Sequence, residues 1–281
     1  MLSTKQKIRI ARTAARVVTG VRRGFGAGDN AKVRRDGLTW QLELGEGIDF
    51  AIYLLGAFER TTQRQYGALL KPGDVALDIG ANIGAHTLPI SRLVGDTGFV
   101  HAFEPTAFAY AKLKANIARN AVLAERIQAN QTLLSDGAQD APPAALAASW
   151  PLGERPGGHP MHGGHDMTTA GASVDTLDGY VARAEIARID FIKLDVDGNE
   201  CQVLRGGFES LQRFRPPIIL ELAPYIFSRG ENSFASFIKL LRDAGYQLMR
   251  APAGAPLPSD AAALSRAIPD GFSINAWAMP A

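Results

Sequence analysis

The stretch Val75-Ala-Leu-Asp-Ile-Gly-Ala-Asn-Ile-Gly84 decides the fold class of this chain. An apolar run ends in an acidic residue, and a glycine-rich turn then opens a segment with helical spacing at about residues 85–94. In nucleotide-binding α/β folds this strand, turn and helix form the first unit, and the ligand binds at the carboxyl end of the strand. The residues of this unit that we predict to bind a cofactor are Asp78, Gly80, Asn82 and Gly84.

Apolar runs recur along the chain after this unit. They lie at Phe99–Phe103, Ile127–Leu134, Ile189–Leu194 and Ile218–Leu222, followed by Tyr246–Met249 and Phe272–Ala278. Segments with helical spacing separate most of them, at about 106–120, 199–213 and 233–244. Apolar strands that alternate with helices predict a Rossmann-like α/β fold, with a mostly parallel seven-stranded sheet and helices on both faces. The last two runs have no long helix between them, which predicts an antiparallel edge.

The N-terminal part has a different pattern of apolar residues. Residues 31–55 read as strands, because alternate residues from Leu38 to Leu44 are apolar and Asp36-Gly37 is a hairpin-turn signal. We therefore divide the chain into an extension at residues 1–70, with a basic helix and a β-hairpin, and a main domain at residues 71–281.

Composition excludes several classes of protein. The chain has 281 residues, 46% of them hydrophobic and 21% charged, which rules out collagen-like, low-complexity and wholly disordered chains. Cys201 is the single cysteine, so an intramolecular disulfide and a four-cysteine zinc site are impossible. No apolar run approaches the ~18 residues that a membrane span needs. We expect a cytoplasmic protein.

Charge is distributed unevenly. Residues 1–35 hold ten Lys or Arg and one acid, a balance of +9, whereas the rest of the chain carries −7. Within this arm, Ile10, Ala14, Val17 and Val21 are spaced like one helical face. We expect this face to pack on the protein's own domain, and a targeting helix or a weak contact with a membrane surface is the alternative.

The glycine turn also indicates which cofactor binds. Glu104 lies twenty residues after Gly84, the spacing at which an acid accepts hydrogen bonds from ribose hydroxyls. Asn82 stands where a dinucleotide motif has a glycine that lets a pyrophosphate approach the backbone, and there is no Gly-Lys-Ser/Thr phosphate loop. A ligand with adenosine and no phosphate fits better, which points to S-adenosylmethionine.

Several blocks of the sequence resemble the FkbM family of S-adenosylmethionine-dependent methyltransferases. The blocks are Leu77–Gly84, His101–Pro105, Leu113–Asn120, Val174–Asp178, Asp190–Glu200, Val203–Gly207 and Pro217–Glu221. The resemblance implies a class I methyltransferase fold and O-methylation of sugars or polyketide-like metabolites. We add Asp136 to the predicted cofactor-binding residues. Asp197 and Asn199 depart from the residues that the family usually has.

Two further acids end strands at the same edge of the predicted sheet. Asp195 follows Phe191-Ile-Lys-Leu, and Glu221 follows Ile218-Ile-Leu. We predict both as catalytic residues, with Asp195 also near the cofactor. An alcohol is a poor nucleophile, so these carboxylates could act as a general base or hold a Mg²⁺ ion that polarises the hydroxyl. Lys193 lies inside an apolar run and should be paired with an acid or functional.

Residues 136–170 form a long insertion rich in Ala, Pro and Gly. His159, His162 and His165 lie within it at intervals of three. We predict a mobile lid over the acceptor pocket at residues 153–168, with His162 as a candidate general base, and a zinc site is the alternative reading.

Together these features predict an enzyme that methylates a hydroxyl on a sugar, glycoside or secondary metabolite. The partner would be a small-molecule or glycan acceptor, without nucleic acid, and a homo-oligomer is compatible with the sequence. The alternatives are an RNA-modifying or nucleic-acid-binding protein that uses the basic arm, and a non-catalytic binding module.

Overall fold

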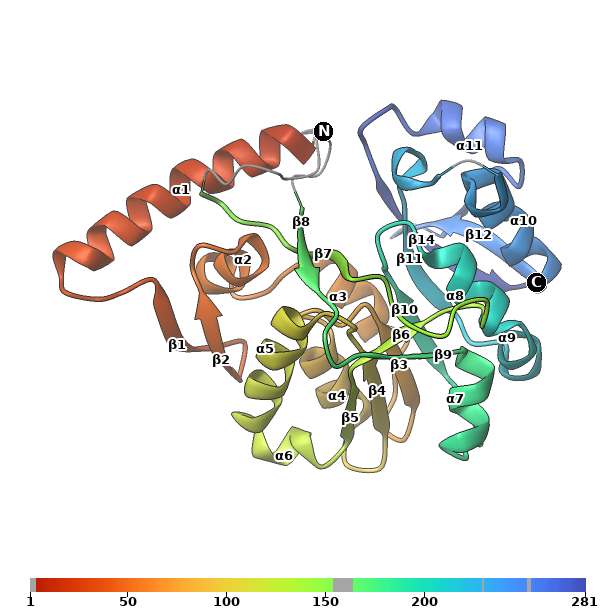
Figure 1. Ribbon diagram of the computed structural model, residues 1–281, viewed down its shortest axis with the longest axis horizontal. Helices are drawn as coiled ribbons and strands as arrows, with labels where there is room; N and C mark the ends of the chain where they lie inside the picture. Colours follow the sequence, from red (N-terminus) through yellow and green to blue (C-terminus); the bar gives the residue numbers. More distant parts are fainter. Residues whose placement is uncertain (1–3, 154–163, 229, 252–253) are drawn as a thin grey trace.

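A single mixed sheet forms the centre of the computed structural model, which describes residues 4–153, 164–228, 230–251 and 254–281 (Figure 1). The strand order is β13-β12-β14-β11-β10-β3-β4-β5. The bounds are β3 Val75–Ile79, β4 Phe99–Phe103, β5 Ile127–Asn130, β10 Phe191–Leu194, β11 Ile218–Leu222, β12 Tyr246–Arg250, β13 Ala255–Pro256 and β14 Ile274–Pro280. The predicted Rossmann-like, mostly parallel sheet is confirmed, with the two-residue β13 added to the seven expected strands.

The predicted antiparallel edge is present, because β12 and β14 pair antiparallel at one end of the sheet and the short β13 joins β12 there. β14 inserts between β11 and β12 and is antiparallel to both. Its Ala276 and Ala278 are fully buried, because both faces of the sheet are covered at this point.

Helices cover both faces because alternate strand residues face opposite sides. Ala76 packs with Ile90 and Val94 of α4 on one face, whereas Leu77 belongs to the core cluster that includes Val203 of α8 on the other. The helices after β3 are α4 Thr87–Val94, α5 Ala107–Ala118, α6 Ala121–Ala124, α7 Leu177–Arg183, α8 Glu200–Gly206, α9 Phe208–Phe214, α10 Phe234–Asp243 and α11 Ala261–Ala267, with short 3₁₀ turns η1 Pro224–Ile226 and η2 Gly230–Asn232.

Two predicted elements are divided in the structure. The run Ile127–Leu134 leaves the sheet after β5, and β6 Thr132–Leu134 pairs instead with β9 Ser173–Asp175. The helix predicted over 199–213 is interrupted between α8 and α9, where Gly206 lies so close to Ser135 that a Cβ would be 1.9 Å from the Ser135 carbonyl oxygen.

The N-terminal extension contains more helix than predicted. Its elements are α1 Thr4–Gly24, β1 Asn30–Arg35, β2 Leu38–Glu43, α2 Gly47–Leu55 and α3 Arg60–Gly67. The hairpin turn at Asp36-Gly37 is present, with both residues at positive φ. The strand prediction is wrong for residues 47–55, where Asp49 is buried in α2 and pairs with Lys112 of α5 at 2.7 Å. A short apolar run is compatible with a buried helix as well as with a strand. Here the segment is a helix, and its contact with α5 stabilises it.

The long insertion contains a second hairpin. β7 Ala145–Ser149 pairs with β8 His165–Thr168, and residues 154–163 between them lie outside the described residues. The chain after β7 is attached to the extension, because the Glu46 carboxylate accepts hydrogen bonds from the Ser149 hydroxyl (2.9 Å) and the Trp150 main-chain N–H (3.0 Å). Across the described parts of the chain, no helix combines the length and apolar character needed to cross a bilayer.

Candidate active site

A cavity of about 880 Å³ opens at the carboxyl ends of the parallel strands. Its floor consists of residues 79–82 after β3, 103–106 after β4, 132–134 of β6, and Lys193, Asp195 and Glu221 at the ends of β10 and β11. α1, α2 and residues 146–152 form its outer wall. The size lies in the range of small-molecule sites, and crevices at this edge of an α/β sheet are where such folds bind ligands.

Gly80 is the position where the chain requires a glycine most strictly. Its φ is +83°, and a Cβ would lie 1.8 Å from the Asp195 carbonyl oxygen. The Gly80 carbonyl accepts a hydrogen bond from Lys193 Nζ at 3.0 Å. The turn after β3 and the end of β10 are therefore in direct contact, which places the cofactor-binding turn beside the predicted catalytic acid.

Asn82 and Gly84 have different roles in the same turn. Asn82 lines the cavity in the left-handed conformation, with φ +47°. Its side-chain amide donates to the Ala148 carbonyl at 3.3 Å, so it also fixes the β7 hairpin. Gly84 does not line the cavity; a Cβ there would be 2.9 Å from Leu113 of α5. Gly84 therefore serves helix packing.

Glu104 fits the role of a ribose acceptor. The side chain is buried and lines the cavity. Its carboxylate accepts hydrogen bonds from the Asn82 N–H (3.1 Å), the Thr106 N–H (2.9 Å) and the Thr106 hydroxyl (2.6 Å). An ionised carboxylate offers about four acceptor positions, so one is left for a ligand hydroxyl. Burial raises the pKa of Glu104, and these three donors oppose that shift.

Besides Gly84, two predicted cofactor-binding residues lie away from the cavity surface. Asp78 is fully buried beneath the turn, where it accepts from the Thr87 hydroxyl at 2.6 Å and lies 3.8 Å from Lys193 Nζ. Asp136 pairs with Arg205 at 3.0 Å and is not among the residues that line the cavity. The structure thus brings Gly80, Asn82 and Glu104 together, but it does not bring Asp136 to them.

Lys193 is paired with acids, as expected of a lysine in an apolar strand. Its Nζ lies 3.2 Å from the Asp195 carboxylate and 3.8 Å from that of Asp78. Burial opposes the positive charge, but Asp195 and Asp78 outweigh it and hold the pKa of Lys193 above its ordinary value. The lysine therefore stays protonated and fixes Asp195, whose side chain is 37% exposed, at the cavity edge.

Glu221 faces the same cavity from β11. Its carboxylate accepts a hydrogen bond from the Ser273 hydroxyl. Burial and the nearby Asp195 raise the pKa of Glu221 to about 7. A carboxylate that titrates near neutrality can take up a proton at the working pH of an enzyme.

The turn after Asp195 is closed by an acid that the sequence reasoning missed. Asn199, the N-cap residue of α8, makes no side-chain capping hydrogen bond. Instead the buried Glu200 carboxylate accepts from the N–H groups of Val196 (3.2 Å) and Gly198 (3.0 Å). Burial raises the pKa of Glu200 to about 7.

The predicted Mg²⁺ site is not supported. Asp195 and Glu221 line one cavity, but Lys193 pairs with the first and Ser273 binds the second. Among the described residues, no group of three or more His, Cys, Asp or Glu side chains is placed to hold a metal ion.

The histidines are divided between two regions. His159 and His162 lie outside the described residues, so the predicted role of His162 is untested, and His165 belongs to β8. His86 lines the cavity. Burial and the charge of Lys193 lower the pKa of His86 to about 3, so it is neutral and cannot act as an acid at pH 7.

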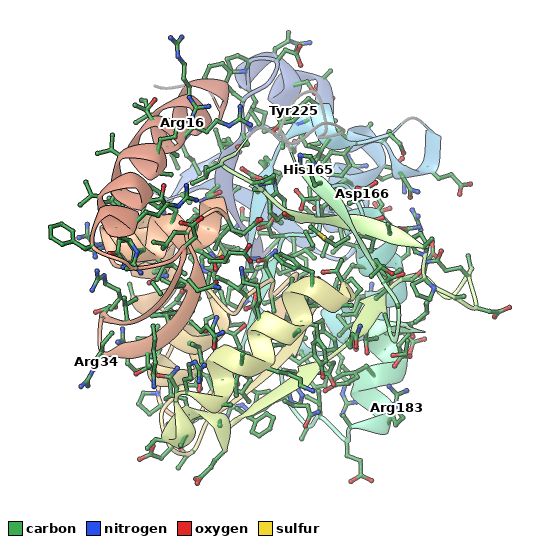
Figure 2. The ribbon with its side chains drawn as sticks, turned by 60° about the vertical axis from the view of Figure 1, so that its left-hand side comes forward. Arg16, Arg34, His165, Asp166, Arg183 and Tyr225 are labelled. Atoms are coloured by element: carbon green, nitrogen blue, oxygen red, sulfur yellow. The ribbon has the colours of Figure 1, made fainter. Side chains whose placement is uncertain are left out.

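Several cavity residues carry no motif that could have revealed them. They are Arg12 of α1, Glu59 and Arg60 at the start of α3, and Tyr225 of η1, which Figure 2 labels. They reach the cavity from segments far apart in the sequence, so only the tertiary structure identifies them.

Comparisons with known proteins identify the family of the chain. The methyltransferase FkbM domain model matches residues 78–248. The 31-O-demethyl-FK506 methyltransferase FkbM of Streptomyces tacrolimicus is 32% identical over 174 residues, which cover 50% of this chain and 62% of that protein. The hexuronic acid methyltransferase AglP of Haloferax volcanii is 29% identical over 144 residues, which cover 50% of this chain and 52% of that protein. The matches therefore span less than two thirds of either relative.

A crystal structure of an FkbM methyltransferase from Methylobacillus flagellatus aligns with 77% of this chain and 50% of its own, at 15% identity and a TM-score of 0.44. The domain match alone covers more than half of the chain and includes the β3 turn, Glu104, Asp195 and Glu221. The matched methyltransferase domain implies S-adenosylmethionine as the methyl donor. The chain belongs to the FkbM family of methyltransferases.

Proposed function

We propose that the protein transfers a methyl group from S-adenosylmethionine to a hydroxyl oxygen of a sugar, glycoside or secondary metabolite. The observation that carries the proposal is the single cavity that joins the Gly80 turn and Glu104 to two acids, Asp195 and Glu221. The names of the two relatives support it, because one acts on a demethylated FK506 and the other on a hexuronic acid.

The cofactor half of the cavity is suited to an adenosine ligand. When bound, S-adenosylmethionine supplies an electrophilic methyl group on a sulfonium centre. Glu104 would accept a ribose hydroxyl, and the apolar Ile79, Phe103 and Leu134 would face the uncharged parts of the ligand.

The acceptor half needs a group that takes the hydroxyl proton. Of the two acids, Glu221 is the better general base, because its pKa of about 7 lets it accept a proton near neutral pH. Asp195 is held by Lys193, so it would position the hydroxyl and keep the negative charge that raises the pKa of Glu221. No metal ion is needed in this scheme.

Two arginines that line the cavity, Arg12 and Arg60, favour an acceptor that carries an anionic group. The Nε of Arg12 is buried at the cavity without a hydrogen-bond partner in the described part of the chain. Arg60 donates to the Leu55 carbonyl at 2.6 Å. A guanidinium with unused donors matches a carboxylate or phosphate.

The test is methyl transfer from labelled S-adenosylmethionine to matched acceptors. A uronic acid glycoside and the corresponding neutral glycoside should both gain label, the acid with the lower KM, and a chelator should leave the rate unchanged. Arg12→Gln should raise the KM of the acidic acceptor about tenfold, the equivalent of ~1.4 kcal/mol, and change that of the neutral one little. Label that appears only on RNA would refute the proposal in favour of an RNA-modifying enzyme.

A further inference from the structure

Helix α1 has two apolar faces, and the protein buries the one with the smaller side chains. Ala11, Ala15 and Val18 pack against the core cluster formed with β2 and α2, and Ala15 is only 5% exposed. This is not the face that we predicted to pack. Only Ala14 of the predicted face touches that cluster.

The larger apolar side chains of α1 point away from the protein. Ile10, Val17 and Val21 are 57%, 62% and 56% exposed, and Phe25 just after the helix is 88% exposed. At 100° per residue the three helical positions lie within about 40° of one another, so they form one stripe. The described part of the chain exposes seven large hydrophobic side chains, and six of them belong to this stripe, to Phe25 or to the end of α2.

This arrangement is unfavourable for a helix that meets only water. Each buried square ångström of apolar surface stabilises by about 25 cal/mol, so rotating Ile and Val inward would be worth more than burying Ala. A continuous exposed stripe on a packed helix therefore indicates a surface that another apolar phase covers.

The positive charge around the stripe indicates a partner with an anionic surface. The first 35 residues carry +9, and the one acid among them, Asp29, pairs with Arg23. Arg9 and Arg16, seven residues apart, are both exposed along one flank of the stripe. In Figure 2, Arg16 on α1 and Arg34 on β1 lie on the same side of the molecule. A helix with an apolar stripe and a basic flank is suited to the interface of an anionic bilayer.

We propose that α1 docks on the surface of a membrane that contains anionic lipid, with Ile10, Val17, Val21 and Phe25 inserted among the headgroups. The helix lies on the membrane and does not span it, because its other side packs on the protein. Ala11 and Arg12 on that other side line the cavity. Docking thus brings the active site next to the lipid surface, and it does so independently of which acceptor is methylated.

The test is co-sedimentation of the full-length protein with vesicles of phosphatidylcholine alone or with 30% phosphatidylglycerol. Wild-type protein should sediment with the anionic vesicles, less so as salt is raised, and hardly at all with the neutral ones. Val17→Ser with Val21→Ser should lower the partition coefficient roughly tenfold or more. Val122→Ser is the matched control, since Val122 is 69% exposed on α6 and outside the stripe. Binding of S-adenosylmethionine should be the same in all three proteins.

Four results would overturn the proposal. Wild-type protein could fail to bind anionic vesicles at low salt, or the double variant could bind as tightly as the Val122→Ser control. A dimer in light scattering that the double variant converts to a monomer would show that a second copy covers the stripe. Salt-sensitive binding to RNA without binding to vesicles would assign the basic flank to nucleic acid.

Discussion

At the residue scale, the proposed function assigns the role of general base to Glu221. We expect Glu221→Gln to reduce kcat by about 10²–10⁴-fold, because the variant keeps the shape and loses the base. Affinity for S-adenosylmethionine, measured by calorimetry, should be unchanged. Glu231→Gln on the exposed η2 is the control for a general effect of removing an acid. A Glu221→Gln enzyme with normal turnover on its acceptor would move the role to Asp195 or to His162.

The pH dependence of turnover follows from the same residue. Burial and Asp195 raise the pKa of Glu221 to about 7, so the carboxylate is protonated below that pH and ionised above it. A base must be ionised to act. The rate should therefore rise with pH through about 7 and then level off, and Glu221→Gln should remove this step from the profile.

Gly80 is the residue whose backbone the site depends on most. Gly80→Ala would put a Cβ 1.8 Å from the Asp195 carbonyl and an L side chain at φ +83°. We expect a loss of roughly 2–5 kcal/mol in the free energy of unfolding, together with loss of cofactor binding. Gly28→Ala is the matched control, because a Cβ there meets nothing within 4 Å. Equal melting temperatures for the two variants would contradict this reading of the turn.

At the scale of elements, α1 is a wall of the active site as well as a surface helix. Ala15→Glu would place a charge in the apolar contact with β2 and α2 and release the helix. The KM for the acceptor should rise about tenfold, whereas cofactor affinity should change little because the cofactor half is built from other elements. Thr13→Glu, on the exposed side of α1, is the control. Parallel losses of cofactor and acceptor affinity would show that α1 supports the whole fold.

The predicted lid over the acceptor pocket is also a question at the scale of elements. The structure ties residues 149–152 to Gly45–Gly47, through the Glu46 carboxylate and the main chain. This part of the insertion is therefore a fixed wall. We predicted that residues 153–168 are mobile, and most of them, residues 154–163, lie outside the described part of the chain.

At the scale of the whole molecule, buried acids make stability depend on pH. Burial raises the pKa of Glu200 to about 7 from an ordinary 4.5. Between these values the folded protein binds a proton that the unfolded chain has lost, so the free energy of unfolding falls as pH rises through this window. Urea unfolding of the ligand-free protein should show this fall between pH 4.5 and about 7, and Glu200→Gln should make it smaller. The same slope in both proteins would contradict the role of Glu200.

The sequence alone determined the central unit of the fold and the family. The apolar run to Asp78, the glycine turn and Glu104 are local patterns, and the backbone geometry of a strand and a tight turn constrains them wherever they occur. The expectation that Lys193 is paired follows in the same way, since a lysine inside an apolar strand needs a neighbouring acid. These features require no knowledge of distant contacts.

Only the tertiary structure decided the rest. The sequence pattern of the nine α2 residues fits a strand as well as a helix, and the buried ion pair of Asp49 with Lys112 belongs to the helical form. The sequence of α1 likewise allows either apolar face to be buried, and the structure packs Ala11 and Ala15 against the hairpin. Asp136 pairs with Arg205 of α8, which lies 69 positions further along the chain, and this contact keeps Asp136 away from the cavity. Each of these outcomes depends on which surfaces meet in space, and the free energy of those contacts outweighs the local preferences that a sequence pattern records.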